Sequence, residues 1–351
     1  MRRPWLAPLV PLYAAGLAWR DLSLRRGWAP VKRLRSPVIS IGNLSTGGSG
    51  KTPLAIALAR RLEARGVAVD VLSRGYGRSN SEPACVDPEG TAEQFGDEPL
   101  LIAREAGVPV FVAPQRYDAG LLAEADSTTE NASKNASENA LGQQDAHRSH
   151  ISAAHILDDG FQHRQLFRDV DILLLNREDW RDSVLPAGNL RETLRAAKRA
   201  DVIAIPAGDS VFESELRRWG WTGPVWRLRR CMNVPLVGGP VYAFCGIARP
   251  EQFFAGLESN GLGVAACNAF RDHHRYTRED VDRLIAAARA TGAIALVTTE
   301  KDAVRLGALA SVFPSEMPLK TAHLSIGIDG EASALDWLIG RLRSSASLPS
   351  V

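Results

Sequence analysis

A short glycine-rich segment between an apolar run and a helix-like segment constrains this chain more than any other feature. Residues 42–53 read Gly-Asn-Leu-Ser-Thr-Gly-Gly-Ser-Gly-Lys-Thr-Pro. The apolar run at 38–41 predicts a strand before the segment, and residues 54–65 predict a helix after it. Glycines allow backbone N–H groups to approach a phosphate closely, and the N-terminus of a helix adds partial positive charge. The pattern therefore predicts a strand, loop and helix that hold the phosphates of a nucleotide.

The residue types in this loop indicate what each would bind. Lys51 is placed to meet the β- and γ-phosphates, and the hydroxyl of Thr52 is placed to hold Mg²⁺. The predicted phosphate-binding residues are Ser45, Thr46, Gly47, Gly48, Ser49, Gly50, Lys51 and Thr52. The usual glycine is replaced by Ser45, and the spacing resembles the variant loop of partition-type ATPases, although Thr46 stands where those proteins have an additional lysine. The alternative is a glycine turn that binds nothing.

The composition is that of a soluble globular protein from a reducing compartment. The chain has 351 residues, enough for two domains, with 45% hydrophobic and 23% charged residues. The four cysteines are spread along the chain and form no Cys-x-x-Cys pair. This spacing argues against both a disulfide framework and a zinc site.

The first 35 residues differ from the rest in charge and hydropathy. They carry eight arginines and lysines against one acidic residue, a net charge of +7, whereas the remainder carries 34 basic and 39 acidic residues, a net charge of −5. The uncharged segment 4–19 is shorter than the roughly 20 residues that span a bilayer. Its tryptophans and basic flank favour a helix lying on an anionic membrane surface. A secretory signal, or a helix packed on the protein's own core, are the alternatives. Because the basic excess stops at residue 35, we expect no nucleic-acid partner.

Apolar runs alternate with helix-like segments along the rest of the chain. Strands are expected at 38–41, 67–72, 108–112, 155–158, 170–175 and 202–205. This alternation favours an α/β fold with a doubly wound, mostly parallel sheet of the P-loop NTPase type. The polar, repetitive stretch at 127–150 predicts a disordered insert.

A change in composition at 234–240 predicts a linker to a second, smaller α/β domain. Its expected elements are strands at 241–244, 262–266 and 293–298 and a helix at 278–290. We therefore expect a membrane-associating segment at 1–35, a nucleotide-binding domain at 36–235 and a C-terminal domain at 240–345.

Acidic residues stand where catalytic groups are expected. Asp158 and Asp159 close an apolar strand downstream of the loop, where carboxylates can hold Mg²⁺ directly or through water. The alternative is a cap or a turn. Asp97 follows a glycine and begins a helix, so it is either an N-cap or a general base for phosphoryl transfer.

Basic residues offer further candidates. Arg191 follows a glycine turn and is either a neutraliser of transferring phosphate or a member of a solvated ion pair. Arg116 likewise meets phosphate or lies on the surface. The pair His273-His274 precedes a helix start, where histidines usually cap the helix; a histidine from the second domain could instead reach across a cleft to Asp97. The acidic residues at 298–302 are expected to be mainly structural.

Taken together, these motifs resemble those of the tetraacyldisaccharide 4′-kinases, the lipid A 4′-kinases of Gram-negative bacteria. The motifs that carry the resemblance, in chain order, are Gly42-Asn43 with Gly47-Gly48-x-Gly50-Lys51-Thr52-Pro53, Ser73-Arg-Gly-Tyr-Gly, Gly96-Asp-Glu-Pro, Leu157-Asp-Asp-Gly-Phe-Gln-His163, Leu185-Pro-x-Gly-x-Leu-Arg-Glu192, Asp272-His273 and Thr299-Glu-Lys-Asp302. They cover nearly the whole chain, and their combination is specific although no single motif is.

The resemblance implies ATP- and Mg²⁺-dependent phosphorylation of the 4′-hydroxyl of a tetraacylated glucosamine disaccharide 1-phosphate, giving lipid IVA. It implies that the enzyme acts at the cytoplasmic face of the inner membrane, with the lipid and an anionic membrane surface as partners and no obligate protein partner. Asp97 is implied to be the catalytic base with His273 as its partner, and Asp158 and Asp159 to lie at the metal and the catalytic centre. Residues implied to line the site are Arg116, Gln162, His163, Arg191 and Glu192.

The competing function is a regulatory ATPase, akin to partition or metallochaperone ATPases, that acts on a protein partner. It accounts for the glycine pattern and the paired acids. It accounts less well for the apolar N-terminus and for the Asp-His motif.

Overall fold

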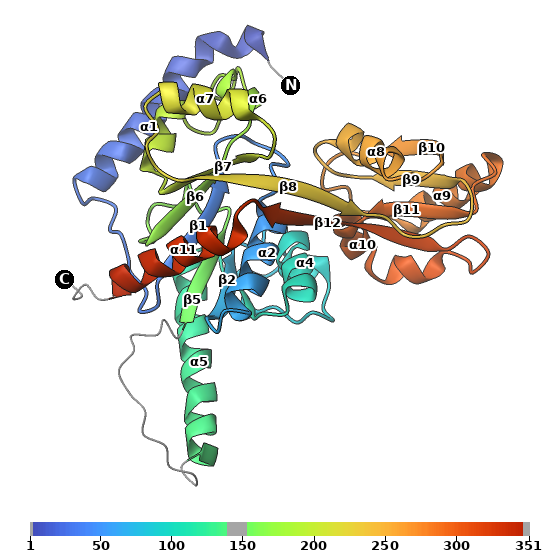
Figure 1. Cartoon of the computed structure of the whole chain (residues 1–351). Helices are drawn as coiled ribbons and strands as arrows, with labels where there is room; N and C mark the ends of the chain where they lie inside the picture. Colours follow the sequence, from blue (N-terminus) through green and yellow to red (C-terminus); the bar gives the residue numbers. More distant parts are fainter. Residues whose placement is uncertain (1–2, 139–152, 347–351) are drawn as a thin grey trace.

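One sheet of twelve strands runs through the molecule, with the first strand of the chain in its interior (Figure 1). The computed structural model describes residues 3–138 and 153–346. The strand order is β10-β9-β11-β12-β8-β7-β6-β1-β5-β2-β4-β3. Every neighbouring pair is parallel except β8 with β12 and β3 with β4. The predicted α/β fold with a mostly parallel, doubly wound sheet is therefore confirmed.

The strands are β1 (Val38–Asn43), β2 (Ala68–Ser73), β3 (Ala84–Cys85), β4 (Val110–Val112), β5 (Ala153–Asp158), β6 (Val170–Leu174), β7 (Val202–Pro206), β8 (Val225–Asn233), β9 (Val241–Cys245), β10 (Val264–Ala269), β11 (Ala295–Thr299) and β12 (Leu319–Ile328). The helices are η1 (Pro4–Leu9), α1 (Val10–Arg25), α2 (Lys51–Glu63), α3 (Ala92–Phe95), α4 (Asp97–Ala106), α5 (Arg116–Glu138), α6 (Arg177–Trp180), η2 (Leu194–Arg199), α7 (Ser210–Arg218), α8 (Pro250–Ser259), α9 (Arg278–Ala290), α10 (Glu300–Leu306), η3 (Gly307–Val312) and α11 (Glu331–Ala346).

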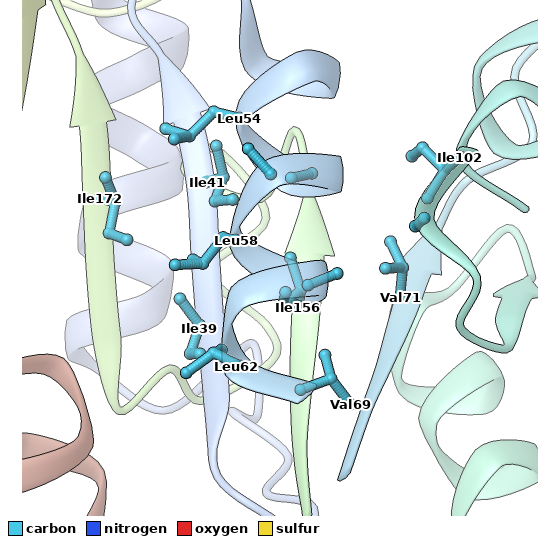
Figure 2. Close-up of a cluster of buried hydrophobic side chains, with 14 of the residues drawn as sticks. Ile39, Ile41, Leu54, Leu58, Leu62, Val69, Val71, Ile102, Ile156 and Ile172 are labelled. Atoms are coloured by element: carbon cyan, nitrogen blue, oxygen red, sulfur yellow. The ribbon is translucent and has the colours of Figure 1, made fainter. Parts of the chain in front are cut away.

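The helix that follows the glycine-rich loop is fixed by packing on the central strands. Leu54, Leu58 and Leu62 recur every fourth residue, so they share one face of α2. That face covers Ile39 and Ile41 of β1, and all five side chains are fully buried (Figure 2). Burying such side chains contributes about 1.5–3 kcal/mol each, which holds the loop firmly between β1 and α2.

Two long strands connect the two parts of the molecule. β8 continues past its pairing with β7, and β12 returns antiparallel to it, with Ile326 opposite Arg230 (Figure 1). Beyond them β9, β10 and β11 form a smaller sheet portion with α8, α9 and α10.

The chain's last helix returns to the first part of the molecule, which differs from the expected C-terminal domain at 240–345. Leu335, Leu338 and Leu342 of α11 belong to the same hydrophobic core as Ile39 of β1. The composition near residue 234 marks where the chain leaves the first part, but it carries no mark of where the chain comes back.

The segment expected to be a disordered insert begins as a helix. α5 runs without a break from Arg116 to Glu138, so the residues from 127 to 138 are helical. A helix already begun at Arg116 can continue into a polar stretch, and residues 127–138 include alanines and glutamates, which are good helix formers. The remaining part of the predicted insert, 139–150, lies outside the described residues.

The N-terminal segment forms the two consecutive helices η1 and α1, which lie on the outside of the fold. Val10 and Tyr13 pack partly on a core beneath them, whereas Trp5, Leu12 and Trp19 are 63–74% exposed. Among the described residues, none of the helices combines the length and the hydropathy needed to cross a bilayer.

Candidate active site

The predicted phosphate-binding residues form a tight turn at the carboxyl end of β1. Gly47 and Gly50 have φ angles of 107° and 92°, a region that glycine enters without steric cost, and Gly50 directly precedes α2. Thr52 is buried in the first turn of α2. The loop thus lies where α/β folds of this kind bind ligands, at the carboxyl edge of the sheet.

The Leu185–Glu192 segment is hydrogen-bonded to the start of this loop. The Thr46 N–H donates to the carbonyl of Asn189 at 2.8 Å, and the Arg191 N–H donates to the carbonyl of Leu44 at 2.6 Å. These two backbone hydrogen bonds bring motifs about 145 residues apart into direct contact. The side chain of Arg191 is therefore positioned by the loop itself.

Arg191, Asp159 and Lys51 form one charged cluster. Arg191 donates two hydrogen bonds of 2.8 Å to the two carboxylate oxygens of Asp159, and the Lys51 ammonium lies 3.6 Å from the same carboxylate. Burial opposes ionisation of Asp159, but the hydrogen bonds from Arg191 and the charges of Lys51 and Arg191 lower its pKa to about 2. Lys51 and Arg191 also bond the side-chain oxygen of Asn43 at the end of β1.

Asp158 has the properties of an unsatisfied metal ligand. It is 2% exposed, and its Oδ1 has no hydrogen-bond partner among the described residues. Burial, with the nearby carboxylates of Glu98 and Asp159, raises the pKa of Asp158 to about 7. An unpaired buried carboxylate is costly, and a cation removes that cost. Carboxylate and hydroxyl oxygens are the ligands that Mg²⁺ prefers, so Asp158 and Thr52 fit that ion.

Asp97 and His273 come together from the two parts of the molecule. The imidazole Nδ1 of His273 lies 3.0 Å from the Oδ2 of Asp97, and Arg305 of α10 donates to the same oxygen at 2.8 Å through Nε. Burial opposes ionisation of Asp97, but His273 and Arg305 together hold its pKa well below the usual range. The hydrogen bond to Asp97 raises the pKa of His273. Asp97 is the first residue of α4, and Gly96 occupies the N-cap position instead.

Apart from Arg191, the residues implied to line the site have different surroundings. Arg116 is buried, and its Nε has no hydrogen-bond partner among the described residues. Burial and the charges of Arg116, Arg168 and Arg74 lower the pKa of His163 to about 4, so this imidazole is neutral. Gln162 donates to the carbonyl of Asn43 at 2.9 Å.

Glu192 lies against the N-terminal helix. Its carboxylate pairs with Arg20 of α1 at 3.1 Å and with Arg199 at 2.9 Å. Glu192, which directly follows Arg191 in the chain, thus links this segment to the outer helix α1.

The contacts that join α10 to α4 were not predicted from the sequence. Lys301 pairs with Glu98 at 2.5 Å, next to the Asp97–Arg305 contact. Asp302 is fully buried, accepts hydrogen bonds from the Gly246 N–H and the Tyr276 hydroxyl, and pairs with Arg305 at 3.1 Å. Lys301 and Arg305 are four residues apart and share a helix face, a spacing that could have indicated a common partner.

Three comparisons relate the chain to known proteins. A family model described as tetraacyldisaccharide-1-P 4′-kinase (LpxK) matches residues 2–343. The chain is 39% identical over 343 residues to the tetraacyldisaccharide 4′-kinase of Koribacter versatilis, covering 95% of this chain and 97% of that protein. It is 38% identical over 348 residues to that of a Jannaschia species, covering 96% and 95%. A crystal structure of LpxK from Aquifex aeolicus in complex with ATP is similar with a TM-score of 0.68 and 30% identity, covering 95% of this chain and 98% of that one.

Proposed function

The chain belongs to the tetraacyldisaccharide-1-phosphate 4′-kinase family, and from that premise we propose how its residues divide the work of phosphoryl transfer. The enzyme uses ATP to phosphorylate the 4′-hydroxyl of a disaccharide 1-phosphate precursor of lipid A. The comparisons give no support to a regulatory ATPase.

The observation that carries the residue assignments is the contact between His273 and Asp97. These side chains come from positions 176 residues apart and meet at 3.0 Å. Asp97 stays ionised at neutral pH because its pKa is depressed, so it is a weak base by itself. His273 has a raised pKa and a partner that fixes its ring, which are the properties of a proton acceptor.

We therefore assign the proton-accepting step to His273. Nδ1–H donates to Asp97, which leaves Nε2 to take the proton of the 4′-hydroxyl. The hydroxyl oxygen attacks the γ-phosphorus of ATP as the bond from that phosphorus to the β,γ-bridging oxygen breaks, and ADP leaves. Asp97, expected from the sequence to be the base, orients the imidazole and stabilises its protonated form. Both residues remain catalytic in this scheme.

The charged cluster of Lys51, Asp159 and Arg191 at the glycine-rich loop would neutralise the negative charge of the nucleotide phosphates. Lys51 and Arg191 are released from Asn43 and Asp159 to meet the phosphates, while Asp159 keeps both cations in place beforehand. Arg116 adds a buried positive charge with a vacant donor. When bound, Mg²⁺ would offset phosphate charge, and Asp158 and Thr52 are the residues that would hold it.

The N-terminal helices supply the contact with the membrane surface. A lipid's sugar hydroxyl lies at headgroup level, so a kinase acting on it benefits from an interfacial helix. Trp5, Leu12 and Trp19 are the exposed apolar side chains suited to that layer. The surface we propose is the cytoplasmic face of the inner membrane, where ATP is available.

The function is tested by following the label of γ-labelled ATP in the presence of Mg²⁺ and a disaccharide 1-phosphate lipid in detergent micelles. Label transferred to the lipid is expected from the purified wild-type protein. The Lys51→Ala variant should lose both transfer and nucleotide affinity, whereas Asp97→Ala should lose transfer and keep affinity. Release of label only as free phosphate would contradict the kinase assignment.

A further inference from the structure

Arg230 is a cation beside the phosphate-binding loop that the scheme above leaves without a role. It lies on β8, in the stretch that pairs only with β12 and connects the two parts of the molecule. A Cβ atom placed on Gly50 would lie 2.9 Å from the Nη2 of Arg230. The guanidinium therefore touches the last residue of the loop before α2.

The side chain of Arg230 is exposed beside the loop, and the protein leaves its charge unneutralised. Within residues 3–138 and 153–346, no carboxylate pairs with it, and its one side-chain hydrogen bond goes to the neutral Oε1 of Gln252 at 3.2 Å. Arg249 lies near enough to repel it, and desolvation together with that charge lowers the pKa of Arg230. Arg249 itself is paired with Glu178 at 2.9 Å. The positive end of α2 adds further repulsion.

The adjacent residue provides a contrast within the same strand. Arg229 points to the other face of β8, where its Nε pairs with Asp329 at 2.7 Å. Arg229 is thus neutralised by the protein, whereas Arg230 lies against the loop without a carboxylate partner among the described residues.

We propose that Arg230 is a further nucleotide-binding residue, which contacts a phosphate of ATP from the strand that joins the two parts of the molecule. The inference rests on the proposed nucleotide site. Gln252 of α8 bonds the other side of the guanidinium, and Ala248, in the loop between β9 and α8, lies 3.6 Å from a Cβ placed on Gly47. Residues attached to the second sheet portion therefore lie beside the loop.

The experiment measures the affinity for Mg-ATP by calorimetry, and the KM for ATP and kcat, in wild type, Arg230→Gln and Arg229→Gln. A charged hydrogen bond is worth about 1.5–3 kcal/mol, so Arg230→Gln should weaken ATP affinity and raise KM roughly 10- to 100-fold. Arg229→Gln, which removes a surface ion pair, should stay within about threefold of wild type.

The variants separate this inference from the nucleotide site itself. If wild type binds Mg-ATP and Arg230→Gln binds it equally well, Arg230 has no such role. If wild type binds no nucleotide, the proposed site fails. Thermal unfolding without nucleotide checks that Arg230→Gln is folded. If it is not, Arg230→Ala takes its place: a loss of ATP affinity of the same size is expected, and an affinity equal to that of wild type would overturn the proposal.

Discussion

Two residues of the candidate site have strained backbone conformations. Among the described residues, the non-glycine positions with positive φ are Asp159 at 50° and His273 at 59°. That conformation costs about 1–2 kcal/mol and persists only where the surroundings determine it. Asp159 is fixed by two hydrogen bonds from Arg191, and His273 by Asp97 and by its own N–H, which donates to Asp272. The strain coincides with two of the residues to which we assign a role in phosphoryl transfer.

The pH dependence of catalysis tests the assignment of His273. The imidazole accepts a proton only when neutral, so kcat/KM should fall as the pH drops through its pKa. Asp97 raises that pKa above the ordinary value of about 6.5. In Asp97→Asn the support is lost, so the acidic limb of the profile should move to lower pH while the maximal rate drops at least about 100-fold.

Asp272→Asn is the matched control, because this carboxylate also raises the pKa of His273 but does so only through its charge. Asp272→Asn should also shift the acidic limb of the kcat/KM profile to lower pH, but by a smaller amount than Asp97→Asn. A limb that stays in place in Asp97→Asn would exclude His273 as the titrating group.

At the scale of elements, helix α1 contacts the Leu185–Glu192 segment directly. The Tyr13 hydroxyl donates to the carbonyl of Arg191 at 2.8 Å, and Arg20 pairs with Glu192. Asp21 accepts a hydrogen bond from Arg164 at 2.5 Å. The inner face of α1 thus contacts the Arg191–Glu192 segment, and its outer face carries the exposed Leu12 and Trp19. Removing the whole helix would disturb both faces, so the proposed membrane contact is better tested by changing the exposed apolar side chains alone.

The triple variant Trp5→Ser, Leu12→Ser and Trp19→Ser removes the outer apolar side chains and keeps Tyr13 and Arg20. We expect its binding to anionic vesicles to weaken at least about tenfold, because each buried large apolar side chain contributes about 1.5–3 kcal/mol. Turnover of vesicle-borne substrate should fall with it, while calorimetric affinity for Mg-ATP stays unchanged. Leu236→Ser, at a fully exposed leucine elsewhere, is the control. Equal vesicle binding by the triple variant and wild type would contradict the membrane assignment.

The elements that the sequence predicts well are those with a local signal. The central strands are buried on both faces and appear as apolar runs, and the helix at 278–290 has both a capping box and a regular apolar face. β8 has exposed arginines among its apolar residues, and its partner β12 lies about 90 residues away, so no local pattern marks it. The site follows the same rule: residues at strand ends were predictable, whereas Arg305 and Lys301 matter only because α10 packs against α4.

At the scale of the whole molecule, the chain leaves the first sheet portion along β8 and comes back along β12, so the nucleotide-binding part is made of both ends of the sequence (Figure 1). Arg61 of α2 pairs with Glu331 at the start of α11 at 2.6 Å, and it also bonds the carbonyl of Ile326 in β12. The helix that follows the glycine-rich loop is therefore supported by residues 265 and 270 positions further along the chain.

This topology makes a prediction about Leu338, which is fully buried in α11 among the residues that pack beneath α2. Leu338→Ala should lower the free energy of unfolding by about 2–5 kcal/mol in chemical denaturation. Asp336→Ala, on the exposed face of the same helix, removes only the ion pair with Arg65 and should cost less than about 1 kcal/mol. Amide hydrogen exchange shows which elements are destabilised. In Leu338→Ala, exchange should become faster in β1 and α2 and remain as in wild type in β9 and β10, because α11 completes the core of the first portion. Faster exchange confined to β9 and β10 would place α11 with the second portion and restore a contiguous C-terminal domain.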